Sequence, residues 1–179
     1  MATDRLRIAG LRPESIVDGP GIRFVVFVQG CPHHCPGCHN PDSLPFDRGS
    51  QVGADELIAK IESNPMISGV TLSGGEPFEQ ADGLVQLAKA VKAMGLELAA
   101  YTGYTFEALW VRSMTDSGVA SLLHTADILV DGPYIAAQRS LSLRFRGSRN
   151  QRIIHLPSSR KAGCAILDTS ERWNGPTSR

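Results

Sequence analysis

Short apolar segments alternate with amphipathic segments along most of this 179-residue chain. The apolar segments are rich in β-branched and aromatic residues and mostly end in glycine, as buried strands do; they span residues 22–30, 69–75, 96–103, 126–132 and 152–156. Apolar residues recur at helical spacing in the segments between them, at 54–63, 79–95, 105–113 and 118–126. This alternation predicts an α/β fold with a parallel sheet and right-handed crossovers. Because a βα unit takes about 30 residues, the chain is too short for a closed eight-stranded barrel, and we expect a partial, open parallel βα barrel.

Composition limits the domain count and the partners. With 42% hydrophobic residues the chain can bury one core, so we expect a single domain over residues 1–179, with 1–15 as an N-terminal extension and 158–179 as a loosely ordered polar tail. Eighteen basic residues balance eighteen acidic ones, which argues against a nucleic-acid or membrane-surface partner. The first 21 residues have no signal-peptide core and no segment is apolar for long enough to span a bilayer, so we expect a cytoplasmic protein.

Four loops follow predicted strands and carry the distinctive residues of the chain. Their sequences are GCPHHCPGC, SGGEP, YTGY and DGPY. In parallel sheets, ligands bind where the loops at the carboxyl ends of the strands meet. We therefore expect these four loops to line one pocket.

The first of these loops holds three of the four cysteines of the chain, Cys31, Cys35 and Cys38. Their spacing would place them on one face of a regular helix, where they could be small core residues. Two prolines and a glycine oppose a helix through this segment, so we expect the loop to wrap and to point three sulfurs at a common centre. Cys164 lies far from the others in sequence. This distribution suits a metal site in a reduced compartment better than a disulfide framework.

Two metal sites are compatible with these residues. A structural zinc ion would take the three cysteines and one histidine, from His33, His34 or His39. A [4Fe–4S] cluster on three thiolates would leave its fourth iron free for a substrate or cofactor. A ferredoxin-like electron carrier normally supplies a cysteine to every iron, and here the only further one is Cys164.

The pattern C-x3-C-x2-C after the first predicted strand, together with SGGEP after a later one, resembles the radical S-adenosylmethionine superfamily. The resemblance implies a [4Fe–4S] cluster held by Cys31, Cys35 and Cys38, and S-adenosyl-L-methionine bound to the open iron. In that superfamily one electron cleaves the sulfonium, and the resulting 5′-deoxyadenosyl radical abstracts a hydrogen atom. The three histidines are then residues near the cluster or at the surface rather than ligands.

A narrower resemblance is carried by DGPGIRFVVFVQGCPHHCPGCHNP, which is similar to the activating enzymes of glycyl radical enzymes. CPGC, YTGY, LVDGPY and FRGSRNQRII resemble the branch of that family which activates anaerobic ribonucleoside-triphosphate reductase, and the likeness runs from about Ile16 to Ile154. Gly37 stands where many superfamily members have an aromatic residue, a departure that this branch shares. No property of the family extends to the N-terminal extension or the tail.

The resemblance implies roles for six residues around the cofactor, and each has a plainer reading. Ser73, Gly74, Gly75 and Glu76 should approach the methionyl group, since glycines let the backbone come close and a carboxylate can accept hydrogen bonds from an ammonium group; a tight turn would also explain the glycines. Thr102 and Asp131 should border the cofactor, although a helix cap and a turn would equally account for them. No catalytic residue beyond these is assigned.

The segment RGSRNQ, from Arg146 to Gln151, also matches the family, but its chemical role does not follow from its residues. Arg146 could bind a carboxylate through two hydrogen bonds, or the segment could simply order the last strand.

The function that the resemblance implies is reductive cleavage of S-adenosylmethionine and removal of a hydrogen atom from a glycine of a partner reductase. The implied partners are an anaerobic ribonucleoside-triphosphate reductase and a flavodoxin- or ferredoxin-type electron donor. Three alternatives stay open: a radical enzyme acting on a small molecule or peptide, as in deazaguanine synthesis; a zinc-stabilised binding module; and an electron carrier.

Overall fold

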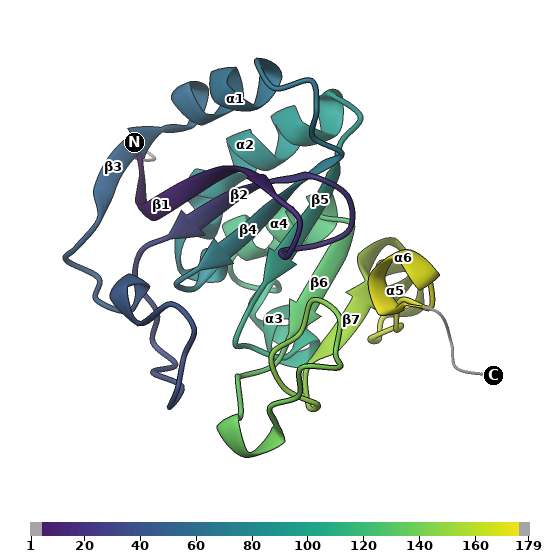
Figure 1. Ribbon diagram of the computed structural model, residues 1–179. Helices are drawn as coiled ribbons and strands as arrows, with labels where there is room; N and C mark the ends of the chain where they lie inside the picture. Colours follow the sequence, from purple (N-terminus) through teal and green to yellow (C-terminus); the bar gives the residue numbers. More distant parts are fainter. Residues whose placement is uncertain (1–4, 176–179) are drawn as a thin grey trace.

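The computed structural model describes residues 5–175, which form one seven-stranded sheet with helices packed against it (Figure 1). The strands are ordered β3-β1-β2-β4-β5-β6-β7, so β3 and β7 form the two edges and the sheet does not close. The expectation of an open α/β sheet is confirmed. Within residues 5–175, no helix is both long and apolar enough to cross a membrane.

The centre of the sheet is parallel. Strand β2 (Arg23–Val28) pairs with β4 (Gly69–Gly74), β4 pairs with β5 (Glu97–Tyr101), and β5 pairs with β6 (Ile128–Asp131), all in parallel register. The connections carry α1 (Ala54–Glu62), α2 (Ala81–Ala93), α3 (Phe106–Arg112) and α4 (Ser117–Thr125). These are the strands and helices that the apolar periodicity predicts.

Two antiparallel strands at one edge were not predicted. Strand β1 (Arg5–Ser15) pairs with β2, and β3 (Ser50–Gly53) pairs with β1. The expected N-terminal extension is therefore part of the sheet from Arg5 onward, and its first four residues lie outside the described range. Only one face of each strand meets the core, so few of their side chains are buried. The sequence therefore carries little apolar signal for either strand.

Strand β7 (Arg152–His155) corrects the prediction that all later strands run parallel. It pairs with β6 in antiparallel register. The segment between the two strands, residues 132–151, contains only the 3₁₀ helix η3 (Ala136–Gln138), so no crossover helix carries the chain to the opposite end of the sheet. The chain enters β7 at the end of the sheet where it leaves β6.

Residues 156–175 are folded where a loosely ordered tail was expected; residues 176–179 of that tail lie outside the described range. Helix α5 (Leu156–Ala162) follows β7 directly, and α6 (Glu171–Asn174) comes after a further turn. Figure 1 shows both beside β7. The polar composition of this segment predicts no buried residue, yet the side chain of Trp173 in α6 is only 1% exposed.

The two faces of the sheet bury different clusters. Side chains that alternate along the parallel strands, such as Phe24, Val26 and Leu98, pack with the helices α1 to α4 in the main core. The intervening side chains face the other way, and Ala99, Val130 and Ile153 pack there against Trp173. Helix α6 thus covers part of the face of the sheet that lies opposite helices α1 to α4, which we call the inner face.

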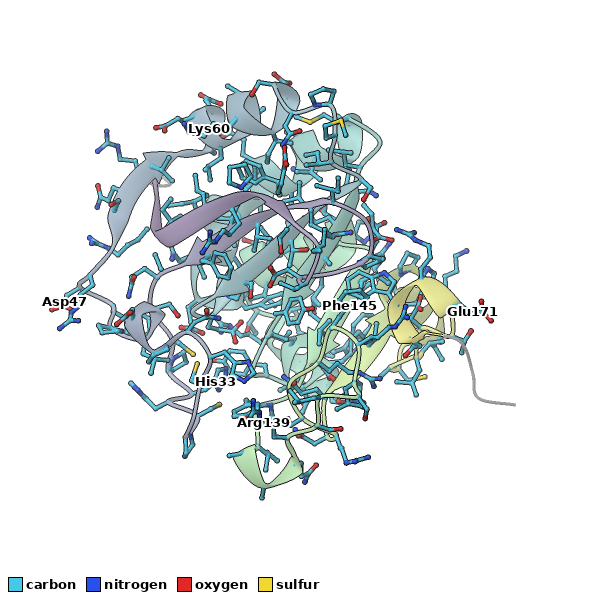
Figure 2. All side chains as sticks on the ribbon, viewed as in Figure 1. His33, Asp47, Lys60, Arg139, Phe145 and Glu171 are labelled. Carbon is cyan, nitrogen blue, oxygen red and sulfur yellow. The ribbon has the colours of Figure 1, made fainter. Side chains whose placement is uncertain are left out.

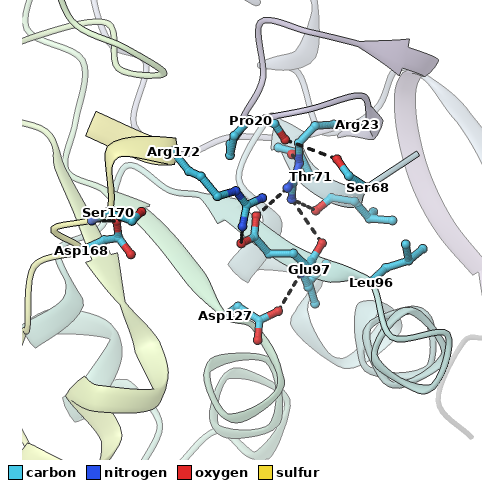
Figure 3. A network of polar contacts seen from close by, with 12 residues as sticks. Pro20, Arg23, Ser68, Thr71, Leu96, Glu97, Asp127, Asp168, Ser170 and Arg172 are labelled. Carbon is cyan, nitrogen blue, oxygen red and sulfur yellow. Dashed lines mark hydrogen bonds and ion pairs between the residues drawn. The ribbon is translucent and has the colours of Figure 1, made fainter. Parts of the chain in front are cut away.

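A buried arginine fixes α6 to this inner face (Figure 3). Arg23 is fully buried; its Nε donates to Thr71 Oγ1 at 2.8 Å and its Nη1 to Glu97 Oε1 at 2.7 Å. Burial lowers the pKa of Arg23, whereas Glu97 opposes that shift. The Trp173 ring lies 5.6 Å from the guanidinium carbon, and Arg172 of the same helix pairs with Glu97 at 3.3 Å.

The same network explains the DGPG segment that precedes β2. Thr71 Oγ1 donates to the carbonyl of Asp18 at 2.8 Å. A side chain at Gly19 would place its Cβ 2.7 Å from Arg23 and 3.0 Å from Trp173, so the absence of a side chain lets this turn lie over the buried pair. DGPG is therefore accounted for by packing against Arg23 and Trp173.

Candidate active site

A cavity of about 770 Å³ opens where the parallel strands end, which is a volume typical of sites for small ligands. All four predicted loops line it, together with the end of β1 and the segment before β7. The predicted convergence is thus present. Among the predicted residues that line the cavity are Cys31, Cys35, Cys38, Ser73, Gly74, Gly75 and Thr102.

The cysteine loop wraps as its glycines and prolines suggest. Gly30, His34 and Gly37 all have positive φ angles, of 95°, 47° and 76°, which turn the chain repeatedly after β2. Cys31 is buried, Cys35 and Cys38 are half-buried, and all three are free thiols that line the cavity. Within residues 5–175, however, no three His, Cys, Asp or Glu side chains are grouped closely enough to hold a metal ion. The loop therefore presents the three sulfurs to one cavity without gathering them at one point.

The donor set fits an iron–sulfur cluster in composition. Three thiols reach the same space, whereas Cys164 is exposed in the turn that follows α5. Burial raises the pKa of the Cys31 thiol to about 11, so iron must displace a proton that this environment retains. Three thiolates would hold a cluster and leave one of its irons without a protein ligand.

The SGG segment packs directly against the start of the cysteine loop. Gly75 N donates to Val28 O at 2.7 Å, and Glu76 N donates to Gly30 O at 2.8 Å. A Cβ at Gly75 would lie 2.3 Å from Gly30 O, a distance that no side chain tolerates. Beyond forming a turn, Gly75 lets the ends of β2 and β4 approach closely.

Glu76 occupies a different position from the one that sequence reasoning predicts. Its side chain is 0% exposed, and its carboxylate oxygens accept hydrogen bonds from groups of the protein. These are Phe78 N at 3.1 Å, Thr102 Oγ1 at 2.9 Å, Gly103 N at 2.8 Å and His33 Nε2 at 3.0 Å. In this arrangement Glu76 joins three loops, instead of offering a free oxygen to an ammonium group.

His33 connects the cysteine loop to the loop after β5. Besides its contact with Glu76, its ring meets the Tyr104 ring edge-on, with centroids 4.4 Å apart. A Cβ at Gly103 would lie 2.3 Å from the His33 ring, so the glycine of YTGY makes room for this side chain. Tyr104 is held in turn by Glu79 at 2.9 Å. Figure 2 shows His33 on the cysteine loop.

Thr102 and Asp131 are placed differently with respect to the cavity. Thr102 lines it and donates to Glu76. Asp131 is 1% exposed; it accepts from Phe106 N at 2.7 Å and from Arg152 Nε at 2.9 Å. Hydrogen bonds to Asp131, and then to Glu107, raise the pKa of Arg152. Asp131 therefore ties β6 to α3 and β7, and its neighbour Gly132 lines the cavity.

Arg146, Gly147 and Gln151 of the RGSRNQ segment line the cavity. Gln151 Oε1 accepts from Gly147 N at 2.8 Å, and Gln151 Nε2 donates to Gly132 O at 3.1 Å, which fixes the segment to the loop after β6. Tyr134 from that loop lies against Gly147, and its ring meets the His39 ring at a tilt of 48°, with centroids 4.9 Å apart. The loop that follows β2 and the loop that follows β6 are thus in contact through His39 and Tyr134.

Several lining residues were not predicted. Ile16 and Val17 come from the turn after the unpredicted β1 and are 74% and 73% exposed at the cavity edge. Phe145 forms another part of the wall, and its carbonyl accepts from Oη of Tyr101, which belongs to the predicted YTGY loop, at 2.8 Å. Exposed isoleucine and valine beside DGPG were the available signal for the first pair.

Comparison with known proteins gives a consistent result. The family described as 4Fe-4S single cluster domain matches residues 17–154. The anaerobic ribonucleoside-triphosphate reductase-activating protein of Vibrio cholerae is 36% identical over 151 residues, which are 80% of this chain and 93% of that protein. The pyruvate formate-lyase-activating enzyme of Clostridium pasteurianum is 41% identical over 106 residues, 56% of this chain and 44% of that enzyme. The crystal structure of QueE from Escherichia coli aligns with a TM-score of 0.45 at 19% identity, over 57% of this chain and 55% of QueE.

Proposed function

We propose a function for this chain from the premise that it belongs to the family of 4Fe–4S single cluster domains and, within it, to the activating enzymes of glycyl radical enzymes. The chain is an iron–sulfur oxidoreductase. Its proposed substrate is an anaerobic ribonucleoside-triphosphate reductase, from which it removes one hydrogen atom of a backbone glycine, with S-adenosylmethionine as the reagent that is consumed.

The observation that carries this proposal is the position of the three cysteines. Cys31, Cys35 and Cys38 line one cavity together with the SGG and YTGY loops, in a chain whose likeness to a reductase-activating protein covers most of its length. A closed zinc site would need a fourth protein ligand. His33 is already engaged by Glu76 and Tyr104, and His39 by Tyr134.

The residues have separate proposed roles. The three cysteines hold the cluster, while Ser73, Gly74, Gly75 and Thr102 border the cofactor. Glu76 and Asp131 keep these loops in place from behind. When bound, the cluster supplies the electron that breaks a sulfonium carbon–sulfur bond of S-adenosylmethionine. One electron, one S-adenosylmethionine and one glycine enter, and methionine, 5′-deoxyadenosine and a glycyl radical leave.

The edge of the cavity suits a protein substrate. Ile16 and Val17 are apolar and exposed, and they line the edge of the cavity. A segment of another protein can therefore cover them as it enters. Glycine suits the chemistry because its α-carbon carries no side chain to block approach, and the radical that remains is delocalised over both flanking amides. A flavodoxin- or ferredoxin-type electron donor and a cytoplasmic location are parts of the same proposal.

The first prediction tests this function directly. The protein reconstituted with iron and sulfide under anaerobic conditions, with reductant and S-adenosylmethionine, will form 5′-deoxyadenosine and methionine, and will produce a glycyl radical in the reductase of the same organism. Electron paramagnetic resonance will detect the radical, and deuterium placed at the target glycine will appear in the 5′-deoxyadenosine. Cleavage without radical or label transfer would instead indicate a radical enzyme acting on a small molecule or peptide. Stoichiometric zinc without sulfide would indicate a zinc-binding module.

A further inference from the structure

Arg146 lines the cavity and has no carboxylate partner among residues 5–175. Its Nε atom is buried and has no hydrogen-bond partner, and its Nη1 reaches only the carbonyl of Gln151, at 3.5 Å. A buried donor without a partner costs about 1–3 kcal/mol, and more when the group is charged. A ligand that supplied acceptors here would remove much of that cost.

Three other partly or fully buried arginines pair with carboxylates, whereas the partly buried Arg160 donates to the backbone carbonyls of Leu123 and Ala126. Arg23 contacts Glu97, Arg112 contacts Glu79 and Asp116, and Arg152 contacts Asp131 and Glu107. Within residues 5–175, no carboxylate lies within 4.0 Å of the Arg146 guanidinium. Desolvation lowers the pKa of Arg146, whereas the nearby Tyr101 hydroxyl opposes the shift. Arg146 is thus partly desolvated, and no residue in the described part of the chain acts as its counter-ion.

The backbone that carries Arg146 is held in a defined position. Phe145 has a φ of 53°, a left-handed conformation that is unfavourable for a bulky residue. Its carbonyl accepts from Tyr101 Oη at 2.8 Å, and its ring packs edge-on against Trp173 with centroids 5.4 Å apart. Figure 2 shows Phe145 between the sheet and α6. On the other side, Gln151 binds Gly147 N. These contacts fix the residues on both sides of Arg146.

The other charged groups that line the cavity do not neutralise this arginine. Arg12 and Glu14 are exposed at its edge, and Asp18 accepts from Ser15 Oγ at 2.5 Å. A planar guanidinium at the cavity wall matches the geometry of a carboxylate, with which it can form two parallel hydrogen bonds.

We propose that Arg146 binds a carboxylate inside the cavity. This inference rests on the proposed function, because S-adenosylmethionine carries a carboxylate on its methionyl group; an acidic side chain of the protein substrate is the other source of the same chemistry. It assigns a chemical role to the RGSRNQ segment, which its sequence alone does not reveal.

Equilibrium binding to the reconstituted iron–sulfur protein tests the assignment. Arg146→Gln will weaken binding of S-adenosylmethionine by roughly 10- to 100-fold, the range of charge-assisted hydrogen bonds. It will leave binding of the decarboxylated analogue, which keeps the sulfonium and the amine, unchanged. Arg146→Lys will restore part of the lost affinity, since it keeps the charge but not the two parallel hydrogen bonds. Arg149→Gln is the matched control, an exposed arginine of the same loop.

The outcomes separate the two sources of the carboxylate. If Arg146→Gln leaves S-adenosylmethionine binding intact but weakens binding of the reductase, the carboxylate belongs to the protein substrate and the assignment holds. Equal weakening for S-adenosylmethionine and its decarboxylated analogue, or no change for any of the three ligands, overturns it. Cluster content and melting temperature measured beside the affinities identify a folding defect, in which case Arg146→Lys decides. Wild-type cleavage of S-adenosylmethionine is independent of these results and tests the proposed function alone.

Discussion

At the scale of single residues, the loops around the cavity are joined by one buried carboxylate. Glu76 accepts hydrogen bonds from the loops that follow β2, β4 and β5, through His33, Phe78 and Gly103. Such a carboxylate holds its neighbours strongly because each contact is charge-assisted and shielded from water. The arrangement of the loops around the cavity therefore depends on the position of the Glu76 side chain as well as on its charge.

Replacing the Glu76 carboxylate by an amide therefore tests a structural role against a direct one. Glu76→Gln will turn one acceptor oxygen into a donor, leave at least one buried donor unsatisfied and lower the free energy of unfolding by about 1–3 kcal/mol. Urea denaturation of the metal-free protein will measure this change, with exposed Glu62→Gln as the control. Unchanged stability combined with weaker S-adenosylmethionine binding would mean that Glu76 touches the cofactor directly.

The sequence indicates the types of residue around the site better than the direction of their side chains. SGGEP and YTGY predict loops that meet, because glycines and strand ends leave a local signal. Whether Glu76 and Asp131 face the cavity depends on partners 26 and 21 residues away, Thr102 and Arg152, whose approach only the folded chain defines. His33 was for the same reason assigned no specific contact.

At the scale of elements, the four central parallel strands and the existence of β7 were predictable, whereas β1, β3 and the direction of β7 were not. β2, β4, β5 and β6 are continuous apolar runs, whereas β1 and β3 are covered on one face and carry weak patterns. The direction of β7 follows from the loop before it, which lacks a crossover helix. Helix α6 is only four residues long and is defined by the burial of one tryptophan.

That tryptophan allows a test of α6 as part of the core. Trp173→Ala will remove a ring that covers Arg23 and packs against Phe145, and will lower the free energy of unfolding by about 3–5 kcal/mol, as large-to-small core substitutions do. Trp173→Phe will cost less because it keeps an aromatic ring there. Chemical denaturation gives both values. If Trp173→Ala costs less than about 1 kcal/mol, α6 does not belong to the core.

At the scale of the whole molecule, the hydrogen-bonded sheet carries loops with few backbone hydrogen bonds of their own. The parallel strands pair throughout, whereas inside the cysteine loop the backbone hydrogen bond from Cys38 N to Cys35 O, at 3.1 Å, is a local one. Because the three thiols share a cavity without being gathered, we expect a cluster that binds them to draw this loop together. A cluster that binds the folded state but not the unfolded state also raises the free energy of unfolding.

Hydrogen exchange can follow this ordering along the chain. Cluster assembly will slow exchange of amides in residues 31–40 by roughly 10-fold or more and will leave β4 and β5 nearly unchanged, since local opening controls exchange in loops. Cys164→Ala will behave like the unmodified protein, whereas Cys35→Ala will keep fast exchange and bind no cluster. Loss of the cluster in Cys164→Ala would show that the ligand set is wrong.

The reversal of direction at β7 has a consequence for how activities can diversify on this sheet. Because the chain leaves β6 and re-enters β7 at the cavity side, residues 132–151 are anchored at both ends beside the site and span no crossover. Extra residues inserted there would add to the cavity wall without shifting any strand register, and lengthening such a loop costs little free energy. A change of substrate could thus arise through loop length alone, on an unaltered scaffold.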